Sequence, residues 1–327
     1  MTLLPNSSQA WLLVEHRTLG LVIYSFIFII GLVVNTTALW VFVLTTKRRS
    51  SVNIYMINVA LVDLTFILML PFRMVYLQWD FWPFADFFCR VCATFNIFYP
   101  CIALWLFALI SADRYTAIVH PKHSKELRNV TKTVVACLGV WLMTLAGTAS
   151  LLFLDDDPDV IGNFTTCLKT VDFVYLHHND PVNFTRMAFF FLLPICVMIG
   201  CYVVIVYKLL CGNASKLKPK VKRKSIRIII TLIVQILVCF VPFHVCLLLH
   251  LVGLDKDEAF RTWAVVSTFL MNTSTVWDII LYYIVSKQFQ DRVFSVILYR
   301  NYLRSVRRKS MRTGSMQSMS NVTSAML

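Results

Sequence analysis

Residues 228–254 read IIITLIVQILVCFVPFHVCLLLHLVGL and contain no Asp, Glu, Lys or Arg. A helix of this length exceeds the roughly 20 apolar residues that cross the hydrocarbon core of a bilayer. Two further stretches, 50–72 and 262–286, contain one acid each, Asp63 and Asp278. The remaining stretches without these charged residue types are 18–46, 91–112, 133–154 and 187–207. We therefore predict an all-α membrane protein, a bundle of seven transmembrane helices.

The composition of the whole chain excludes an ordinary soluble protein. Of the 327 residues 58% are hydrophobic and only 15% are charged, whereas soluble domains are close to half apolar and a quarter charged. Such a chain has more apolar side chains than one aqueous core can bury, so lipid must be its solvent. We expect no second domain.

The loop charges predict the orientation. With the N-terminus outside, 24 of the 31 Lys and Arg residues lie on the cytoplasmic side with three acids, and the outer side has 7 basic and 12 acidic residues. This is the positive-inside pattern. The excess of positive charge, including the cluster 216–227, then faces anionic inner-leaflet lipid and not nucleic acid. We expect a multi-pass protein of the plasma membrane.

The ends of the chain are short. We expect residues 1–18 to be extracellular and residues 19–286 to form the membrane domain. In residues 287–300 apolar side chains recur at helical spacing beside Lys and Arg, which predicts a short amphipathic helix on the inner leaflet. Residues 301–327 are polar and serine-rich, so we expect a disordered cytoplasmic tail whose serines are candidate phosphorylation sites.

This topology also selects the sites of covalent modification. Of the ten cysteines, only Cys89 and Cys167 face the oxidising outer side, so one disulfide between them is predicted. Three Asn-X-Ser/Thr motifs lie outside and are candidate glycosylation sites: Asn6, Asn163 and Asn183.

Ionisable groups within a membrane are costly and indicate a function. Asp63 and Asp278 lie at matching depths of the second and seventh spans, with Asn35 and Ser274 near that depth. Because two like charges in a low dielectric cannot both remain ionised cheaply, they either share a proton or hold a small cation. A structural hydrogen-bonded cluster without an ion is the alternative. Sodium is thus the one cofactor to consider.

Two arginines lie in the outer half of the spans. Arg73 and Arg186 would be costly if they faced lipid, so we expect them to point into the bundle and to bind the acidic head of an amphiphilic ligand. The alternatives are that each extends to the outer interface or pairs with an acid of 155–159. The other expected ligand-binding residues are Asn96, Tyr99, Tyr76, His244 and Phe240. For His244 an internally bonded, structural histidine is the alternative.

Asp113, Arg114 and Tyr115 end the third span on the cytoplasmic side. An arginine held there by its neighbouring acid is a suitable switch, because another element or a partner can compete for it.

At these positions the chain resembles the rhodopsin-like G-protein-coupled receptors over nearly its whole length. The matching residues, in order, are Gly31 and Asn35, Ala60 and Asp63, Cys89, Asp113-Arg114-Tyr115, Trp141, Pro194, Tyr202, Cys239-Phe240-Val241-Pro242, and Asp278 with Tyr282. Longer segments resemble the lipid- and nucleotide-sensing branch: 70–73, 110–115, 215–220 and 283–289.

The resemblance implies a receptor that binds an agonist from outside and activates a heterotrimeric G protein, of the inhibitory class. Arrestin and receptor kinases would act on the serine-rich tail. It implies an N-acyl amino acid or an oxygenated polyunsaturated fatty acid as the ligand, with a nucleotide or a peptide as the alternative. Tyr202 and Tyr282 would move inward on activation, and Pro194 and Pro242 would permit bending.

Three positions depart from the family pattern. Phe240 stands where most members have Trp. Ile279 stands where they have Pro, so we expect no proline kink at that position of the seventh span. Ala103 stands where many have Ser, which removes one oxygen from the sodium site.

Two other classes of protein are weaker alternatives. A cation-coupled transporter would show internal symmetry between its halves, and the odd number of spans argues against it. An enzyme is not expected, because the chain has no HExxH or GxSxG motif and no Cys/His set at metal-ligand spacing.

Overall fold

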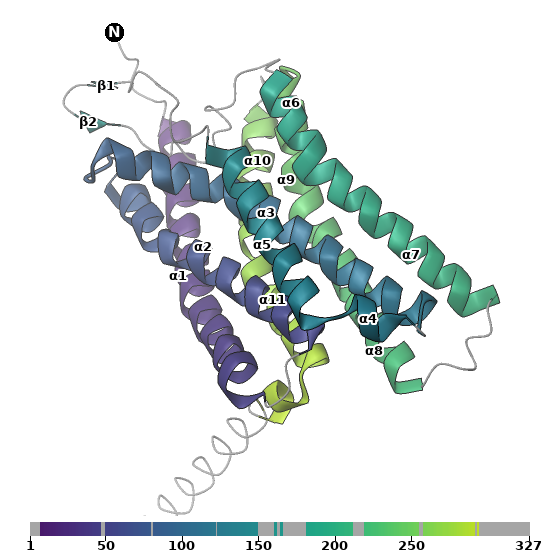
Figure 1. The fold of residues 1–327 in the computed structure, drawn as a ribbon. Coiled ribbons are helices and arrows are strands. Elements are labelled where there is room, and N and C mark those ends of the chain that lie inside the picture. Colours follow the sequence, from purple (N-terminus) through teal and green to yellow (C-terminus); the bar gives the residue numbers. More distant parts are fainter. Residues whose placement is uncertain are drawn as a thin grey trace, which may run out of the picture. The chain divides into compact units, whose positions relative to one another are not determined.

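The structure, a computed structural model, describes residues 7–46, 50–79, 81–121, 123–149, 160–161, 164–165, 181–211, 219–254, 258–291 and 293. Within them, seven helical segments are long and apolar enough to cross a membrane, so the predicted seven-span all-α fold is confirmed (Figure 1). These segments are Arg17–Thr45, Ser51–Trp79, Phe87–Val119, Val130–Ala149, Pro181–Cys211, Val221–Leu251 and Ala259–Val285.

Several spans consist of more than one helix. In chain order the helices of the bundle are α1 (Ser7–Trp40) and η1 (Val41–Thr45), α2 (Ser51–Trp79), α3 (Asp86–Val119), α4 (Ser124–Leu127), α5 (Val130–Ala149), α6 (Pro181–Met187), η4 (Ala188–Leu192), α7 (Leu193–Cys211), α8 (Pro219–Gln235), η6 (Ile236–Phe240), α9 (Val241–Leu251), α10 (Glu258–Asn272) and α11 (Ser274–Val285). The helices extend beyond the uncharged runs of the sequence: α1 begins at Ser7, inside the predicted N-terminal segment, and α3 continues to Val119.

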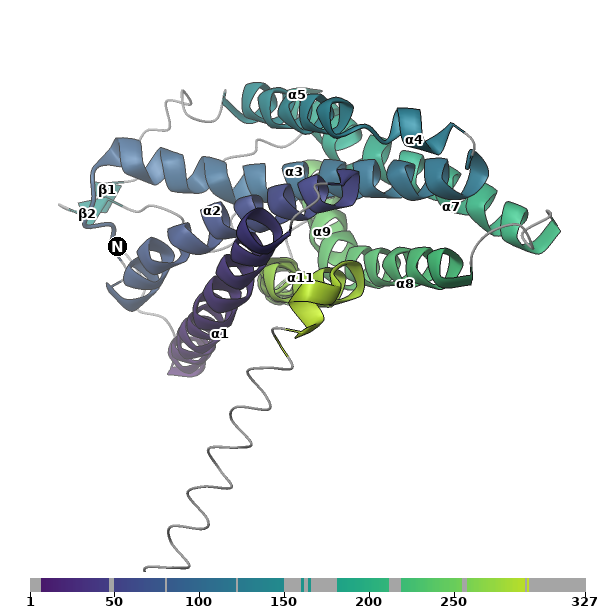
Figure 2. The same cartoon turned by 60° about the horizontal axis from the view of Figure 1, so that its bottom comes forward.

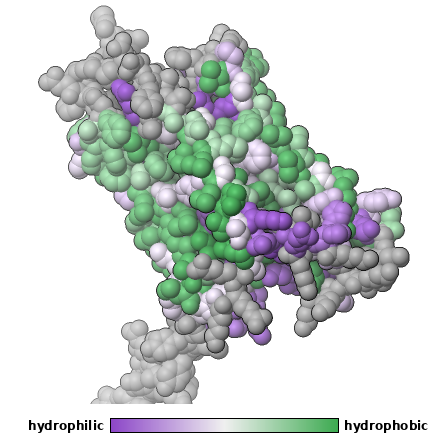
Figure 3. Space-filling model, viewed as in Figure 1, coloured by the Kyte–Doolittle hydropathy of each residue, from purple (hydrophilic) through white to green (hydrophobic). Residues whose placement is uncertain are grey.

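The third span is the centre of the bundle. Helix α3 contacts α2, α5, α7 and α8, and Figure 2 shows it between α5 on one side and α8 on the other. Large apolar side chains on the peripheral helices point outward, for example Leu142, Val203 and Leu210, which are 68%, 62% and 79% exposed. Figure 3 shows an apolar band across this face, with hydrophilic side chains gathered near α4. Lipid would cover this band.

Two spans contain a π-helical turn just before a proline. Helix η4 ends two residues before Pro194, and η6 ends two residues before Pro242. A proline ring clashes with the carbonyl four residues earlier and has no N–H to bond to it, and a π turn relieves this conflict with one extra residue. The predicted bending points at these prolines are therefore sites of altered helix winding.

The seventh span is interrupted, but not at Ile279. It is divided at Thr273 into α10 and α11. The hydroxyls of Thr273, Ser274 and Thr275 bond back to the carbonyls of Leu270, Met271 and Asn272, at 2.7, 2.6 and 3.2 Å. Such back-bonding bends helices. Three adjacent hydroxyls therefore interrupt this span at Thr273, before the position of Ile279, where the family has a proline.

Residues 1–285 form one compact unit and residues 286–327 a second one. In the second, residues 287–291 and 293 are helical, which confirms a further helix after the seventh span. Ser286 caps it, because its Oγ accepts the backbone N–H of Phe289 at 3.2 Å. The rest of the predicted helix and the tail lie outside the described residues.

The loop between α5 and α6 contains two short strands, β1 (Val160–Ile161) and β2 (Phe164–Thr165), paired antiparallel. Cys89, at the start of α3, is disulfide-bonded. The other described cysteines are free thiols: Cys92, Cys101, Cys137, Cys196, Cys201, Cys211, Cys239 and Cys246. Cys167, Asn6 and Asn163 lie outside the described residues.

We expect Cys89→Ser and Cys167→Ser to cause equal losses of surface expression, and the double variant to add no further loss, because both remove the same covalent link. Flow cytometry of a tagged N-terminus measures this. Cys196→Ser, at an exposed free thiol, is the control. A single variant with full expression and activity would show that the pairing is wrong.

Candidate functional site

The polar interior of the bundle is built around Asp63, which is 2% exposed. Its Oδ1 lies 3.3 Å from the hydroxyl of Tyr99 on α3, and its Oδ2 lies 3.2 Å from the hydroxyl of Tyr282 on α11. The Tyr282 hydroxyl is also 2.8 Å from Asn35 Oδ1, and the Tyr99 hydroxyl is 2.5 Å from Ser274 Oγ. Asp63 therefore connects four of the seven spans through two tyrosines.

Asp278 belongs to the same cluster, as its depth predicted. It is joined to Asp63 through Ser274, because the Tyr99 hydroxyl lies near both Asp63 Oδ1 and Ser274 Oγ, and Gln235 bonds both the Ser274 carbonyl and Asp278. Asp278 Oδ1 accepts the hydrogen bond from Gln235 Nε2 at 3.1 Å. Gln235 is 1% exposed and was not predicted, although it is the one amide side chain in the uncharged run 228–254.

The first turn of α11 gives this cluster its backbone partners. Gln235 Nε2 donates to the carbonyl of Ser274 at 3.2 Å, and Asn35 Nδ2 donates to the carbonyl of Thr275 at 3.1 Å. A carbonyl oxygen has two lone pairs and can accept a side-chain donor in addition to a helical bond. The sixth and first spans are thus both bonded to the start of α11.

The sodium site of Asp63, Asp278, Asn35 and Ser274 stays a prediction. Three of the four carboxylate oxygens lie within hydrogen-bonding distance of a tyrosine hydroxyl or of the Gln235 amide, and these groups would compete with a cation for the same lone pairs. Ala103 contributes no side-chain oxygen. In this conformation the four residues lie in the hydrogen-bonded cluster that was the alternative.

Sodium dependence tests this interpretation. We expect that replacing sodium chloride by N-methylglucamine chloride at constant ionic strength changes agonist affinity by less than about twofold, which corresponds to less than ~0.4 kcal/mol. Competition binding on membranes measures it. A larger sodium effect that disappears in Asp63→Asn would establish a cation site despite the bonding seen here.

Arg73 lies in the interior of the bundle on α2 and is 8% exposed. Its Nη1 donates to Asn96 Oδ1 at 2.9 Å, and its Cζ lies 5.1 Å from the ring centroid of Tyr24. None of the ion pairs among the described residues includes Arg73. Burial excludes the alternative in which this side chain extends to the outer interface.

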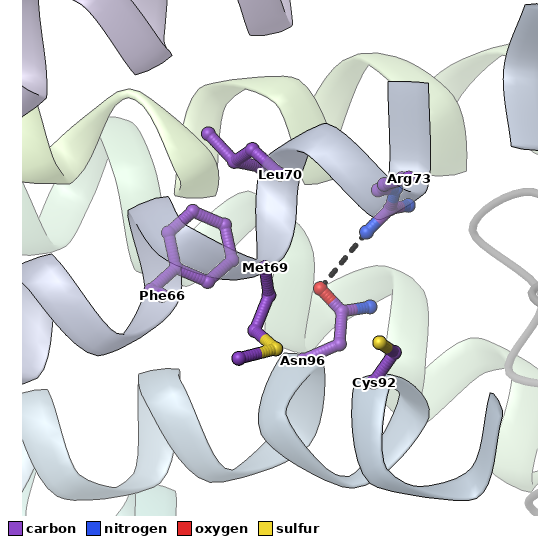
Figure 4. Close-up of a pocket in the computed structure, with 6 residues that line it drawn as sticks. All are labelled: Phe66, Met69, Leu70, Arg73, Cys92 and Asn96. Carbon is purple, nitrogen blue, oxygen red and sulfur yellow. Dashed lines mark hydrogen bonds between the residues drawn. The ribbon is translucent and has the colours of Figure 1, made fainter. Parts of the chain in front are cut away.

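A small cavity adjoins Arg73 (Figure 4). Its volume is about 20 Å³, and its wall is formed by α2 and α3, which leaves room for about one water molecule. The residues that line it are Phe66, Met69, Leu70, Arg73, Cys92 and Asn96. In this conformation the cavity does not admit a ligand head group, so α2 and α3 must shift for one to enter.

Arg186 lies elsewhere, on α6 facing α5. Its Nε donates to the carbonyl of Gly147 at 3.2 Å, and its Nη1 donates to Asn183 Oδ1 at 2.6 Å. It lines a groove that shares no residue with the cavity of Arg73. The expectation that both guanidinium groups line one cavity is therefore wrong, because Arg186 projects toward the fourth span.

This contact also corrects one modification site. Asn183 is 5% exposed and lies within α6, where it accepts the hydrogen bond from Arg186. A glycan on a buried, bonded side chain does not fit this conformation, so Asn183 is not a suitable acceptor.

The other predicted ligand-binding residues have varied positions. Asn96 contacts Arg73, as expected, but Tyr99 belongs to the Asp63 cluster one turn below. Tyr76 packs with Trp82 and Cys92 in an apolar cluster. The ring of His244 stacks on Phe191 at 3.9 Å.

His244 and Phe240 are internal structural residues in this conformation. His244 Nδ1 lies 2.8 Å from the carbonyl oxygen of Phe240, and the side chain is 4% exposed, which matches the structural alternative. Phe240 is fully buried and packs edge-on against Phe107 at 5.8 Å.

At the cytoplasmic end of α3, Asp113 forms an ion pair with Arg114. Asp113 Oδ1 also accepts a hydrogen bond from Arg128 Nε at 2.8 Å. Arg114 is 4% exposed, and its Nε is buried with no hydrogen-bond partner among the described residues. Tyr115 points elsewhere, with its hydroxyl 3.4 Å from His120 Nε2.

Two further contacts join the spans near Arg114. The hydroxyl of Tyr202 on α7 lies 2.6 Å from Ser111 Oγ on α3. Lys224 Nζ on α8 donates to the carbonyl of Val285, the last residue of α11, at 2.5 Å. Helix α8 contains no acidic residue, so the sixth span is held here through a lysine and not through an acid that pairs with Arg114.

Comparison with known proteins shows the family. Residues 34–285 match the 7 transmembrane receptor (rhodopsin family), which covers more than half of the chain. The chain belongs to the rhodopsin family of receptors. The interior acids, the Asp113–Arg114 pair and the prolines of the fifth and sixth spans are thus parts of a receptor, and not of an enzyme.

The receptor is also similar to individual members. It is 60% identical over 314 residues to the N-arachidonyl glycine receptor of Rattus norvegicus, which covers 96% of this chain and 94% of that protein. The same receptor of Homo sapiens is 60% identical over 313 residues, with the same coverage. Lysophosphatidic acid receptor 5 of Bos taurus is 30% identical over 321 residues, 93% of this chain and 82% of that protein.

Proposed function

We propose that this G-protein-coupled receptor binds an acidic lipid, an N-acyl amino acid such as N-arachidonyl glycine or an oxygenated polyunsaturated fatty acid. The observation that carries the proposal is Arg73, a buried guanidinium whose partners among the described residues are a neutral amide and an aromatic ring. A buried cation without a counter-charge is costly. A ligand carboxylate would supply that charge.

The names of the relatives support this ligand class. Those 60% identical are named for an acyl amino acid, and a more distant one is named for a lysophospholipid. Both molecules combine an acidic head with an acyl chain. A nucleotide or a peptide remains the alternative, and a nucleotide would need several cations where Arg73 offers one.

Signal transfer would use the contacts described above. Entry of a head group beside Arg73 requires α2 and α3 to shift, and α3 carries Tyr99 of the Asp63 cluster. The unpartnered Nε of Arg114 is an energetic cost in this conformation, and release from Asp113 would let it bond elsewhere. We propose that Tyr202 and Tyr282 exchange partners in this step, which opens a cytoplasmic surface to a G protein of the inhibitory class.

The cellular setting follows from the same proposal. We place the receptor in the plasma membrane with its N-terminus outside, because that orientation puts the positive loops in the cytoplasm. Receptor kinases and arrestin would act on serines of 301–327, which lie outside the described residues.

A lipid panel tests the function. Cells expressing the receptor are exposed to N-acyl amino acids, oxygenated fatty acids, lysophospholipids and nucleotides, with dissociation of the heterotrimeric G protein as the readout. We expect a response to an acidic lipid, and no response to the same lipid as its neutral methyl ester. A panel in which only nucleotides act would contradict the proposal.

A further inference from the structure

A groove of about 450 Å³ runs between α5 and the start of the fifth span. Its lining is mostly apolar and includes Met143 and Gly147 of α5, Val182 and Thr185 of α6, and Phe189 of η4. Val182 and Phe189 are 57% and 39% exposed. Because these side chains are exposed and both elements belong to membrane spans, the groove opens on the outer surface of the bundle, which lipid would cover.

One charged group lies in this groove. Arg186 follows the first residue of α6 by five positions, about 7.5 Å along the helix. Gly147, whose carbonyl it binds, is two residues from the end of α5. The guanidinium therefore lies close to one end of both spans, at the level where the head group of a membrane lipid lies, and the apolar lining extends beside it.

The shape of the groove depends on a glycine. A side-chain carbon added at Gly147 would overlap the ring of Phe190, which lies against the backbone at this point. The missing side chain thus lets Phe190 pack against α5 and leaves the Gly147 carbonyl within reach of Arg186. The backbone of α5 at Gly147 therefore lines the groove and also binds Arg186.

We infer that this groove is a membrane-facing binding site for a single-chain lipid with a carboxylate head. The acyl chain would lie along Met143, Val182 and Phe189, and the carboxylate would share the Arg186 guanidinium with its protein partners. The inference rests on the proposed function for the class of ligand. It adds a second lipid site on the membrane face of the receptor, between the fourth and fifth spans, which shares no residue with the cavity beside Arg73.

The test uses an N-arachidonyl glycine analogue with a photoreactive diazirine in its acyl chain. Membranes that contain the receptor are irradiated, and labelled peptides are mapped by mass spectrometry. We expect labels within 143–147 and 182–189, competed by unlabelled N-arachidonyl glycine. Thr185→Trp fills the groove from an exposed position and should reduce labelling at least tenfold, whereas Val203→Trp, at a lipid-exposed position outside the groove, should not.

Arg186→Gln keeps a hydrogen-bonding side chain but removes the charge, and it should reduce labelling by the acid to the level of its methyl ester. Labelling confined to α2 and α3, labelling unaffected by Thr185→Trp, or equal labelling by acid and ester would overturn the inference. G-protein dissociation is recorded in parallel. A response without groove labelling leaves the proposed function in place, and groove labelling without any response supports the site but contradicts the function.

Discussion

Arg73→Ala lowers the potency of an acidic lipid agonist about tenfold or more. The reason is that the buried guanidinium forms an ion pair with the ligand carboxylate away from water, and a tenfold change requires only ~1.4 kcal/mol. Concentration–response curves for G-protein dissociation, normalised to surface expression, measure the effect. Arg73→Lys keeps the charge but not the planar two-donor geometry, so its potency should fall between those of the parent and the alanine variant.

The same substitution separates binding from folding. In the absence of ligand, Arg73 is a buried cation with neutral described partners, so Arg73→Met should leave the melting temperature unchanged or raise it. Asn96→Ala removes the partner of Arg73 without removing the charge and should cost less potency. Full potency of Arg73→Ala at normal expression would show that the carboxylate binds elsewhere, and a lower melting temperature of Arg73→Met would show that Arg73 is structural.

Gln235→Leu raises basal G-protein activation severalfold. Gln235 is the donor that links the sixth span to both Ser274 and Asp278, and a hydrogen bond to a charged group is worth about 1.5–3 kcal/mol. If the active arrangement is a minor state a few kcal/mol higher, the loss of these bonds increases its population. Nucleotide exchange by the G protein without agonist measures the change.

A matched variant distinguishes this effect from misfolding. Gln235→Glu keeps the size of the side chain but replaces its donor by a further acid beside Asp278, so it should also raise basal activity. Gln290→Leu, outside the bundle unit, is the control and should have no effect. Basal activity equal to that of the parent in both Gln235 variants, at equal surface expression, would show that the link does not restrain the sixth span.

The sequence predicted the parts of this fold that depend on solvent. A long apolar run without charged residues indicates a span, and acids at matching depths are expected in one polar cluster, which is where Asp63 and Asp278 lie. The rotation of each helix about its own axis depends on packing, and the sequence predicted this rotation less well than the spans themselves. Asn96 and Tyr99 lie one turn apart on α3, yet one binds Arg73 and the other contacts Asp63. The boundary between the two environments falls between them.

The roles of neutral polar residues were also not predicted from the sequence. Gln235 carries no charge and so was not among the predicted site residues, although an amide in a membrane span needs partners for the same reason as an acid. The interruption at Thr273 was also missed, because no proline marks it and only the run of three hydroxyls could have indicated it. Arg186 was assigned to the interior because the neighbouring span that accepts it cannot be identified from one sequence.

The π turn η4 has one more consequence. A five-residue π turn holds one residue more than an α-helical turn, so all of α6 is offset from α7 by about 100° compared with an unbroken helix. The angular phase of Arg186 is therefore set by that single surplus residue, and not by Arg186 itself. If Ala188–Leu192 wound as an α-helix without losing a residue, the guanidinium would rotate away from Gly147. A homologue that is one residue shorter there and α-helical throughout would keep the phase of Arg186, because the surplus residue and the π turn would be lost together.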